Sequence, residues 1–229
     1  MMVRSCLHKK SEQSLTKDEE QHYEGHTMNI AVYCGSNPGD NADYAHAAQE
    51  LGTWIGTHGN TLVYGGSSVG LMGIVSMACL EAGGEVRGVE PQFFIDAGVA
   101  QHNLTELYVV ETMSERKAKM IELADVFVAL PGGVGTLEEI SEIMSRIRLN
   151  MTEGPCFLLN IDHFYDGLAL LLDAMVESNF MEQSDRDQIL FPTSIQALLA
   201  DLFTLQDNPP AKDNPPCVPE SNMRAPLRG

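Results

Sequence analysis

Two short segments of the chain hold side chains that could bind an anionic ligand and act on it. The first contains Arg116 and Lys117, and the second runs Gly132-Gly133-Val134-Gly135-Thr136 with Glu139 three residues further on. Glycines let a backbone approach a ligand closely, and the start of a helix offers unpaired N–H groups with a partial positive charge. The combination favours a phosphate group as the ligand of the second segment.

Arg116 is predicted to lie in the first turn of a helix on the ligand side of the fold. Thr112-Met113-Ser114-Glu115 has the pattern of a capping box, which starts a helix at this point. Met113 is expected to share the core face of this helix with Met120 and Ile121. Basic residues are scarce: five of the seven Lys and Arg side chains between residues 29 and 205 lie between 116 and 148. An anion would therefore be bound in this window.

Glu139 has two interpretations at this level. Thr136-Leu137-Glu138-Glu139 is a second T-x-x-E pattern, so Glu139 could cap a helix that begins at Thr136. Alternatively, a carboxylate beside a helix N-terminus would have a lowered pKa and stay ionised. Such a charge could stabilise a cationic sugar in a glycosidic reaction. Glu138 should point elsewhere, because neighbouring residues of a helix do not share a face.

Short apolar runs alternate with helical patterns along the body of the chain. Strands are expected at 29–34, 61–64, 85–89, 107–110, 126–130 and 156–160, and helices at 44–55, 71–82, 112–124, 136–148, 163–176 and 194–205. This alternation is typical of a parallel sheet covered on both faces, so the predicted fold is α/β, a three-layer doubly wound Rossmann-like domain. Ligands bind such folds at the carboxyl ends of the strands. Those ends carry three glycine-rich turns, which include Gly35 and Ser36, Gly66, and the 131–135 segment.

Composition excludes several classes of function. The chain has 229 residues and a formal net charge of −18, which disfavours binding to nucleic acid. The five cysteines form no C-x-x-C pair and the histidines no metal-binding motif, so neither a disulfide framework nor a metal site is predicted. The sequence shows neither a long apolar run nor a secretory signal, so no membrane association is expected. A cytoplasmic protein is the expectation.

Three segments are expected along the chain. Residues 1–28 are polar and aperiodic and are predicted to be a disordered extension. Residues 29–205 form the expected Rossmann-like domain. Residues 206–229 repeat Asp-Asn-Pro-Pro and are predicted to be a Pro-rich disordered tail.

The motifs together resemble the "Lonely guy" family of cytokinin riboside 5′-monophosphate phosphoribohydrolases, formerly called lysine decarboxylases. Pro131–Glu139 matches the pattern P-G-G-x-G-T-x-x-E, and Met113–Ala118 resembles M-x-x-R-K-A. Supporting matches are Cys34-Gly35-Ser36, Tyr64-Gly65-Gly66 and Val69–Gly73. The resemblance covers residues 29–180 in order. Two departures are Ser114, where the family often has histidine, and Arg146–Asn150, where it usually has a Trp-Ala-Gln-Leu-Gly-like run.

The resemblance implies a homodimer or larger homo-oligomer that cleaves the N-glycosidic bond of an adenine-type nucleoside 5′-monophosphate, releasing the free base and ribose 5-phosphate without a cofactor. Both plain and N6-substituted adenine fall within this substrate class. Arg116 and Glu139 would be the catalytic pair. The substrate-binding residues would be Lys117, Gly132, Gly133, Val134, Gly135, Thr136, Gly35, Ser36, Gly66 and Met113.

Three other functions stay open. The first is a non-catalytic binder or carrier of a nucleotide or cofactor phosphate on the same fold, as in the molybdenum-cofactor carriers, which share a similar glycine loop; it would retain a ligand without releasing a base. An amino-acid decarboxylase would need pyridoxal phosphate held by a lysine as a Schiff base. A DNA-processing protein of this fold is opposed by the acidic body of the chain.

Overall fold

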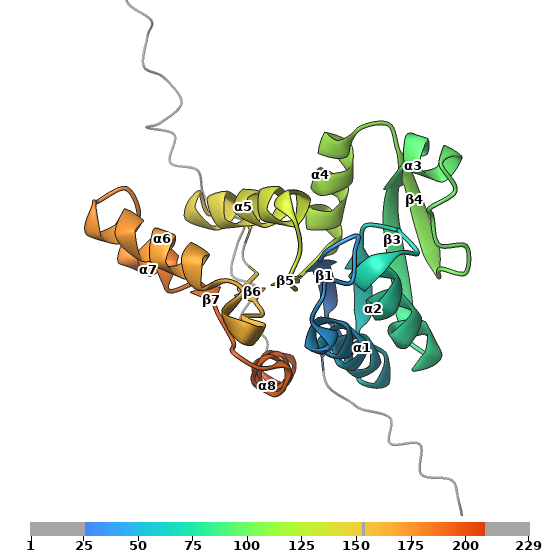
Figure 1. Ribbon diagram of the computed structural model, residues 1–229, viewed down its shortest axis with the longest axis horizontal. Coiled ribbons are helices and arrows are strands. Elements are labelled where there is room, and N and C mark those ends of the chain that lie inside the picture. The colour runs from blue at the N-terminus through green and yellow to red at the C-terminus, as the bar shows by residue number, and fades with distance from the viewer. Residues whose placement is uncertain (1–25, 153, 209–229) are drawn as a thin grey trace, which may run out of the picture.

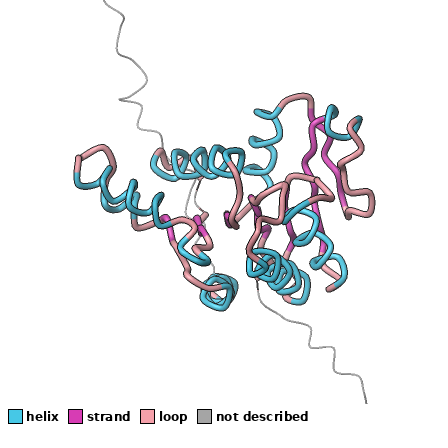
Figure 2. Tube along the Cα trace, viewed as in Figure 1, coloured by secondary structure: helices cyan, strands magenta, loops and turns pink. Residues whose placement is uncertain are grey.

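The computed structural model describes residues 26–152 and 154–208, so most of the predicted extension and tail lies outside the described residues. The centre of the fold is a seven-stranded sheet with the order β4-β3-β2-β1-β5-β6-β7, in which every strand pair is parallel. The expected doubly wound α/β fold is confirmed. Figure 2 shows how strands and helices alternate along the chain.

The described elements follow the expected order. The strands are β1 (Asn29–Tyr33), β2 (Thr61–Tyr64), β3 (Glu85–Pro91), β4 (Glu106–Val110), β5 (Val126–Ala129), β6 (Cys156–Leu158) and β7 (Ile189–Leu190). The helices are α1 (Ala42–Thr57), α2 (Gly70–Glu81), α3 (Gln92–Asp96), α4 (Met113–Leu123), α5 (Val134–Arg148), α6 (Asp166–Glu177), α7 (Gln183–Arg186) and α8 (Ile195–Asp207), with a 3₁₀ turn at Ile161–His163. Within the described residues, none of these helices has both the length and the apolar character needed to cross a membrane.

Three elements were not expected from the sequence. Helices α3 and α7 and strand β7 contain five, four and two residues, respectively. Elements this short do not contain a full helical or strand repeat of apolar residues, and neighbouring structure determines their conformation. The expected helix at 163–176 begins later, at Asp166, because a left-handed residue precedes it at His163 (φ 61°).

Helices cover both faces of the sheet and create two separate apolar cores. Helices α1, α2 and α8 pack on one face, whereas α4, α5 and α6 cover the other (Figure 1). The central strands are buried along their whole length, as expected for parallel strands enclosed on both sides. Both predicted helical layers are therefore present.

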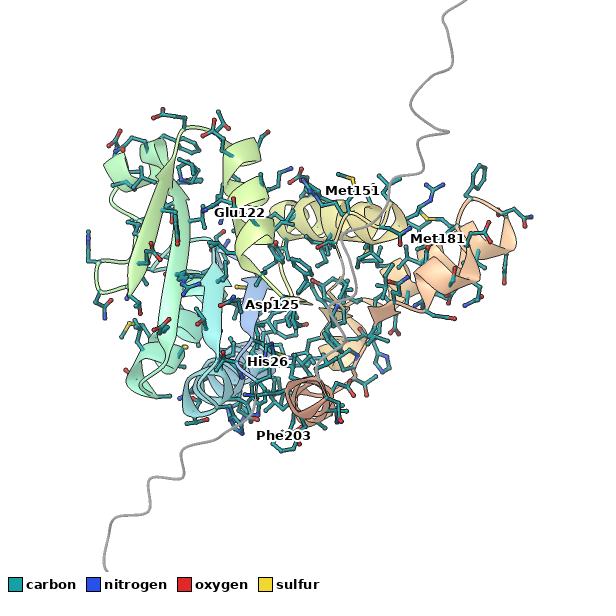
Figure 3. The ribbon with its side chains drawn as sticks, turned by 180° about the vertical axis from the view of Figure 1, so that it is seen from behind. His26, Glu122, Asp125, Met151, Met181 and Phe203 are labelled. Carbon is teal, nitrogen blue, oxygen red and sulfur yellow. The ribbon has the colours of Figure 1, made fainter. Side chains whose placement is uncertain are left out.

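Helix α8 holds the edge of its layer through a buried polar network. Gln206 is 1% exposed; its amide donates to the carbonyl oxygen of His58 at 3.0 Å and accepts from Asn60 at 3.2 Å. Asn60 in turn accepts from the backbone N–H of Met28 at 2.8 Å. One turn before Gln206 lies Phe203, labelled in Figure 3, and its ring centroid is 6.2 Å from that of His58. Gln206 belongs to α8 because this helix continues to Asp207, beyond the expected end at residue 205.

The strand order reverses at β1, and this reversal creates the space for a ligand. The chain proceeds from β1 toward β4 on one side and from β5 toward β7 on the other, so the connections after β1 and β5 diverge to opposite faces. At that edge Gly35 donates to the carbonyl oxygen of Pro131 at 3.1 Å, which joins the two turns. At the opposite edge Asp125, labelled in Figure 3, accepts from the backbone N–H of Asn29 at 2.9 Å.

Close packing of α1 on α2 gives a stability test. A Cβ at Gly52 would lie 2.3 Å from the carbonyl oxygen of Val75. We therefore expect Gly52→Ala to lower the free energy of unfolding by about 1–3 kcal/mol, despite the higher helix propensity of alanine. Gly167 on α6 has nothing within 4 Å of its added Cβ, so Gly167→Ala is the matched control. Urea unfolding followed by circular dichroism measures both; equal stability of the two variants would contradict this packing.

Candidate active site

Helix α4 begins as the sequence predicts and places Arg116 at the carboxyl edge of the sheet. The Thr112 hydroxyl accepts from the backbone N–H of Glu115 at 3.1 Å, and the Glu115 carboxylate accepts from the N–H of Glu111 at 3.0 Å. The cap fixes the first turn, in which Arg116 is 7% exposed. Its Nε donates to the carbonyl oxygen of Val89 in β3 at 3.1 Å.

The guanidinium of Arg116 reaches from β3 to helix α5 and pairs there with Glu139. Nη1 of Arg116 lies 2.5 Å from Oε1 of Glu139, and the two side chains are only 8% and 10% exposed. Charge-assisted hydrogen bonds of this kind are among the strongest in proteins. The two motifs found in the sequence therefore meet as one buried ion pair.

The capping role considered for Glu139 is wrong. Helix α5 begins at Val134 with Gly133 as its N-cap, so Thr136 already lies inside the first turn. Glu139 consequently falls in the second turn, and its carboxylate bonds to Arg116 instead of the helix backbone. Glu138 points away, as expected, and pairs with Lys117 on the surface.

The lowered pKa expected for Glu139 is also wrong. Burial raises the pKa of this carboxyl above its usual range, and the nearby Arg116 only partly opposes the effect. The lowered pKa was expected from the helix N-terminus alone, whereas removal of the side chain from water raises the pKa. A carboxylate with a raised pKa is a better proton acceptor near neutral pH.

Beside the ion pair lies a cleft of about 460 Å³ with a polar and an apolar side. Its lining includes eight residues singled out from the sequence: Gly35, Ser36, Met113, Arg116, Gly133, Gly135, Thr136 and Glu139. Gly132 lines an adjoining cleft of about 260 Å³, which also contains Gly35 and Ser36. The three turns at the strand ends thus surround a single region.

The other three predicted binding residues, Lys117, Val134 and Gly66, line neither of these clefts. Lys117 is held by Glu138 and, at 3.1 Å, by Glu142. Val134 is 82% exposed on the outside of α5. Gly66 is next to a residue of the cleft lining, because an added Cβ at Gly66 would meet the carboxylate of Glu90.

Met113 lies in the cleft, although it was also expected in the core. It is 40% exposed, whereas Met120 and Ile121 of the same helix are buried as predicted. As the first residue of α4, Met113 projects beyond the layer that covers the sheet. Val69, Met72, Phe94 and Val99 join it to form the apolar side of the cleft.

Glu90 is the principal cleft residue that sequence reasoning missed. It lies near the end of β3, is 2% exposed, and its Oε2 has no hydrogen-bond partner among the described residues. Burial raises the pKa of Glu90 to about 7, against the opposing effect of Arg116. An acidic residue directly after the predicted strand at 85–89 was an available signal, but that strand was expected to end two residues before the observed end of β3 at Pro91.

Arg146–Asn150, the run that departs from the family pattern, begins with an arginine that forms an ion pair on the surface of α5. Arg146 donates to Oε1 of Glu142 through Nε at 3.0 Å and Nη2 at 2.9 Å. Glu142 also pairs with Lys117, which pairs with Glu138, so four charged side chains form one network. Neither Arg146 nor Arg148 lines the cleft.

Solved structures resemble the chain in fold. The molybdenum cofactor binding protein of Rippkaea orientalis has a TM-score of 0.60 at 22% identity, covering 79% of this chain and 98% of that one. A molybdenum cofactor carrier protein of Chlamydomonas reinhardtii has a TM-score of 0.60 at 20% identity, with the same coverage.

Sequence comparison gives a nearer relationship. A family model described as "Possible lysine decarboxylase" matches residues 72–202. A cytokinin riboside 5′-monophosphate phosphoribohydrolase of Rhodococcoides fascians is 40% identical over 75% of this chain and 87% of the relative. One from Oryza sativa is 43% identical over 74% of this chain and 71% of the relative. One from Arabidopsis thaliana is 41% identical over 69% of this chain and 69% of the relative. The chain therefore belongs to the Lonely guy family, the family of the cytokinin riboside 5′-monophosphate phosphoribohydrolases.

Proposed function

We propose that this chain hydrolyses the N-glycosidic bond of adenine-type nucleoside 5′-monophosphates, releasing the free base and ribose 5-phosphate. The observation that carries the proposal is the buried Arg116–Glu139 pair in the wall of a cleft that also contains the start of α5. Relatives that share about 40% of the sequence are named for this activity. Their similarity is much higher than that of the cofactor carriers, which share only the fold.

The start of α5 is the proposed site of the 5′-phosphate. Helix α5 has 15 residues and no side-chain cap, so the N–H groups of its first turn are free to bind an anion. Gly133 and Gly135 line the cleft, and an added Cβ at either position would meet nothing within 4 Å. A phosphate group therefore has room beside the backbone of both glycines. The Thr136 hydroxyl lies in the same wall and completes the phosphate site.

The ion pair would act on the sugar. Breaking the glycosidic bond leaves positive charge on the ribose, and the Glu139 carboxylate supplies the opposite charge at that point. The same carboxylate directs a water molecule to the anomeric carbon and accepts its proton. Arg116 holds Glu139 in place through the 2.5 Å contact and offsets the charge of the nucleotide.

A decarboxylase function, suggested by the description of the family model, does not fit the lysines of the described region. A Schiff-base cofactor would need a lysine in the cleft. Within residues 26–152 and 154–208, the lysines are Lys117 and Lys119, and both pair with glutamates outside the cleft. The cleft residues instead suit an anionic nucleotide.

We further propose that the protein works as a homodimer or larger homo-oligomer. Large apolar side chains are exposed on and beside α5 and α6: Leu137, Leu149, Met151, Leu170, Leu171 and Phe180. Met151, at the end of α5, is 59% exposed and labelled in Figure 3. Apolar surfaces of this kind mark sites of association. Light scattering coupled to size-exclusion chromatography would detect the oligomer.

A cytoplasmic location is part of the proposal. Cys34, Cys79 and Cys156 are free thiols buried in the described region. Reduced buried thiols suit a compartment in which disulfides do not persist.

Replacing Glu139 by glutamine tests the catalytic assignment. The amide keeps the shape of the side chain but removes its charge, so kcat should fall ~10²–10³-fold. Chromatographic detection of free base from AMP and from N6-isopentenyl-AMP measures the loss. Glu138→Gln is the matched control, because Glu138 is adjacent but points to the surface. Base release by Glu139→Gln at the wild-type rate would disprove the assignment, provided that circular dichroism shows both variants folded.

Two neighbouring glycines separate ligand binding from folding. A Cβ at Gly132 would lie 2.2 Å from the Thr136 hydroxyl oxygen, whereas one at Gly133 would project into open space. We expect Gly132→Ala to lower the melting temperature. Gly133→Ala should keep the melting temperature but raise KM for AMP, because the added methyl group occupies the proposed phosphate site. A Gly133→Ala variant with unchanged KM would place the phosphate elsewhere.

A further inference from the structure

Glu90 is a buried carboxyl that no step described so far uses. It is 2% exposed, and its Oε2 has no hydrogen-bond partner among the described residues. Leaving a buried polar group unpaired typically costs roughly 1–3 kcal/mol, more if it is charged. A side chain retained in such a position calls for a functional explanation.

The backbone around Glu90 is built to admit this side chain. Gly66, at the end of β2, has φ of +84°, and a Cβ there would lie 2.4 Å from Oε2 of Glu90. Any larger residue at position 66 would therefore collide with the carboxyl. Glu90 also forms part of the cleft lining.

The position of Glu90 complements that of the catalytic pair. Arg116 donates through Nε to the carbonyl oxygen of Val89, the residue before Glu90, and through Nη1 to Glu139. The guanidinium thus connects the strand end that carries Glu90 with the helix that carries Glu139. Glu90 belongs to the same cleft as the apolar side chains of Met72, Phe94 and Met113, which suit the flat face of a purine.

We propose that Glu90 is the general acid of the reaction and protonates N7 of the departing adenine. This inference rests on the proposed function, because it assigns a second group to the same hydrolysis. Departure of an unprotonated purine anion is unfavourable, and a positioned acid typically contributes ~10²–10⁴-fold to such a step. Two carboxyl groups in different environments are the usual solution in glycoside hydrolysis.

The step balances in atoms and charge. The bond between C1′ and N9 breaks and its electron pair goes to the purine, while the Glu90 carboxyl gives its proton to N7. Water adds to C1′ and gives a proton to the Glu139 carboxylate. The products are neutral adenine and ribose 5-phosphate, and the two glutamates exchange protons with solvent before the next turnover.

The surroundings of Glu90 suit a proton donor near neutral pH. Burial raises its pKa to about 7, and Arg116 of α4 opposes this effect. The other titratable groups nearby are Tyr64 of β2, and Cys34 and Glu139 of the cleft lining; burial raises the pKa of each. The tyrosine and the thiol stay protonated over the working range. The acid form of Glu90 is lost as pH rises above about 7, so kcat should decline there.

The test combines Glu90→Gln with substrates that differ in their need for an acid. For AMP, we expect kcat to fall ~10²-fold or more with KM nearly unchanged, and the decline of kcat above neutral pH to disappear. For 4-nitrophenyl ribose 5-phosphate, whose leaving group departs as a stable anion, wild type and variant should be equal. 7-Deaza-AMP lacks N7, so the wild-type protein should hydrolyse it as slowly as Glu90→Gln hydrolyses AMP. Glu85→Gln, at the exposed start of β3, is the matched control.

The outcomes distinguish this inference from the proposed function. If wild type releases neither adenine from AMP nor nitrophenol, the hydrolase function itself is wrong. If wild type is active but Glu90→Gln matches it on AMP, or loses both substrates equally, Glu90 is not the acid. Full wild-type activity on 7-deaza-AMP would exclude N7 as the proton acceptor.

Discussion

The active region depends on one ion pair buried between two helices. Arg116 and Glu139 come from helices on the same face of the sheet, and their contact joins α4 to α5 at the point where the strand order reverses. Removing two charges from water is costly, and a buried pair offsets that cost only with good geometry and further hydrogen bonds. The bond from Arg116 to the Val89 carbonyl supplies one of these. Loss of either partner would leave an unpaired charge inside the protein.

The rest of the fold provides the conditions for this pair. The parallel sheet gives a rigid edge, and the two apolar cores hold helices to both faces. The cap at Thr112 fixes the first turn of α4, while the glycine N-cap of α5 leaves its first N–H groups available. A rigid scaffold of this kind allows a small number of polar groups to remain preorganised for a reaction.

The sequence patterns predicted the elements of this arrangement, whereas only the family resemblance linked Arg116 with Glu139. The alternation of apolar runs predicted the doubly wound sheet, and the capping box predicted the position of Arg116. The start of α5 was placed too late, because the T-x-x-E pattern at Thr136 suggested a cap where Gly133 already provides one. The contact between Arg116 and Glu139 spans 23 residues and depends on how two helices pack, which no local pattern encodes.

Burial explains the remaining differences. The pKa of Glu139 was expected to fall because only its helix was considered, whereas its removal from water has the larger effect. Glu90 was missed because its carboxyl occupies the space left by Gly66. That contact exists only because the fold pairs β2, which precedes Gly66, with β3, which carries Glu90. Lys117 was expected to contact the ligand, but the acidic face of α5 engages it instead.

The central claim is that the chain breaks the bond between base and sugar by hydrolysis. The most direct measurement is the identification of products after incubation of the purified wild-type protein with AMP, by chromatography and mass spectrometry. We expect adenine and ribose 5-phosphate in equal amounts. Recovery of adenosine and phosphate, or of unchanged AMP bound tightly to the protein, would contradict it.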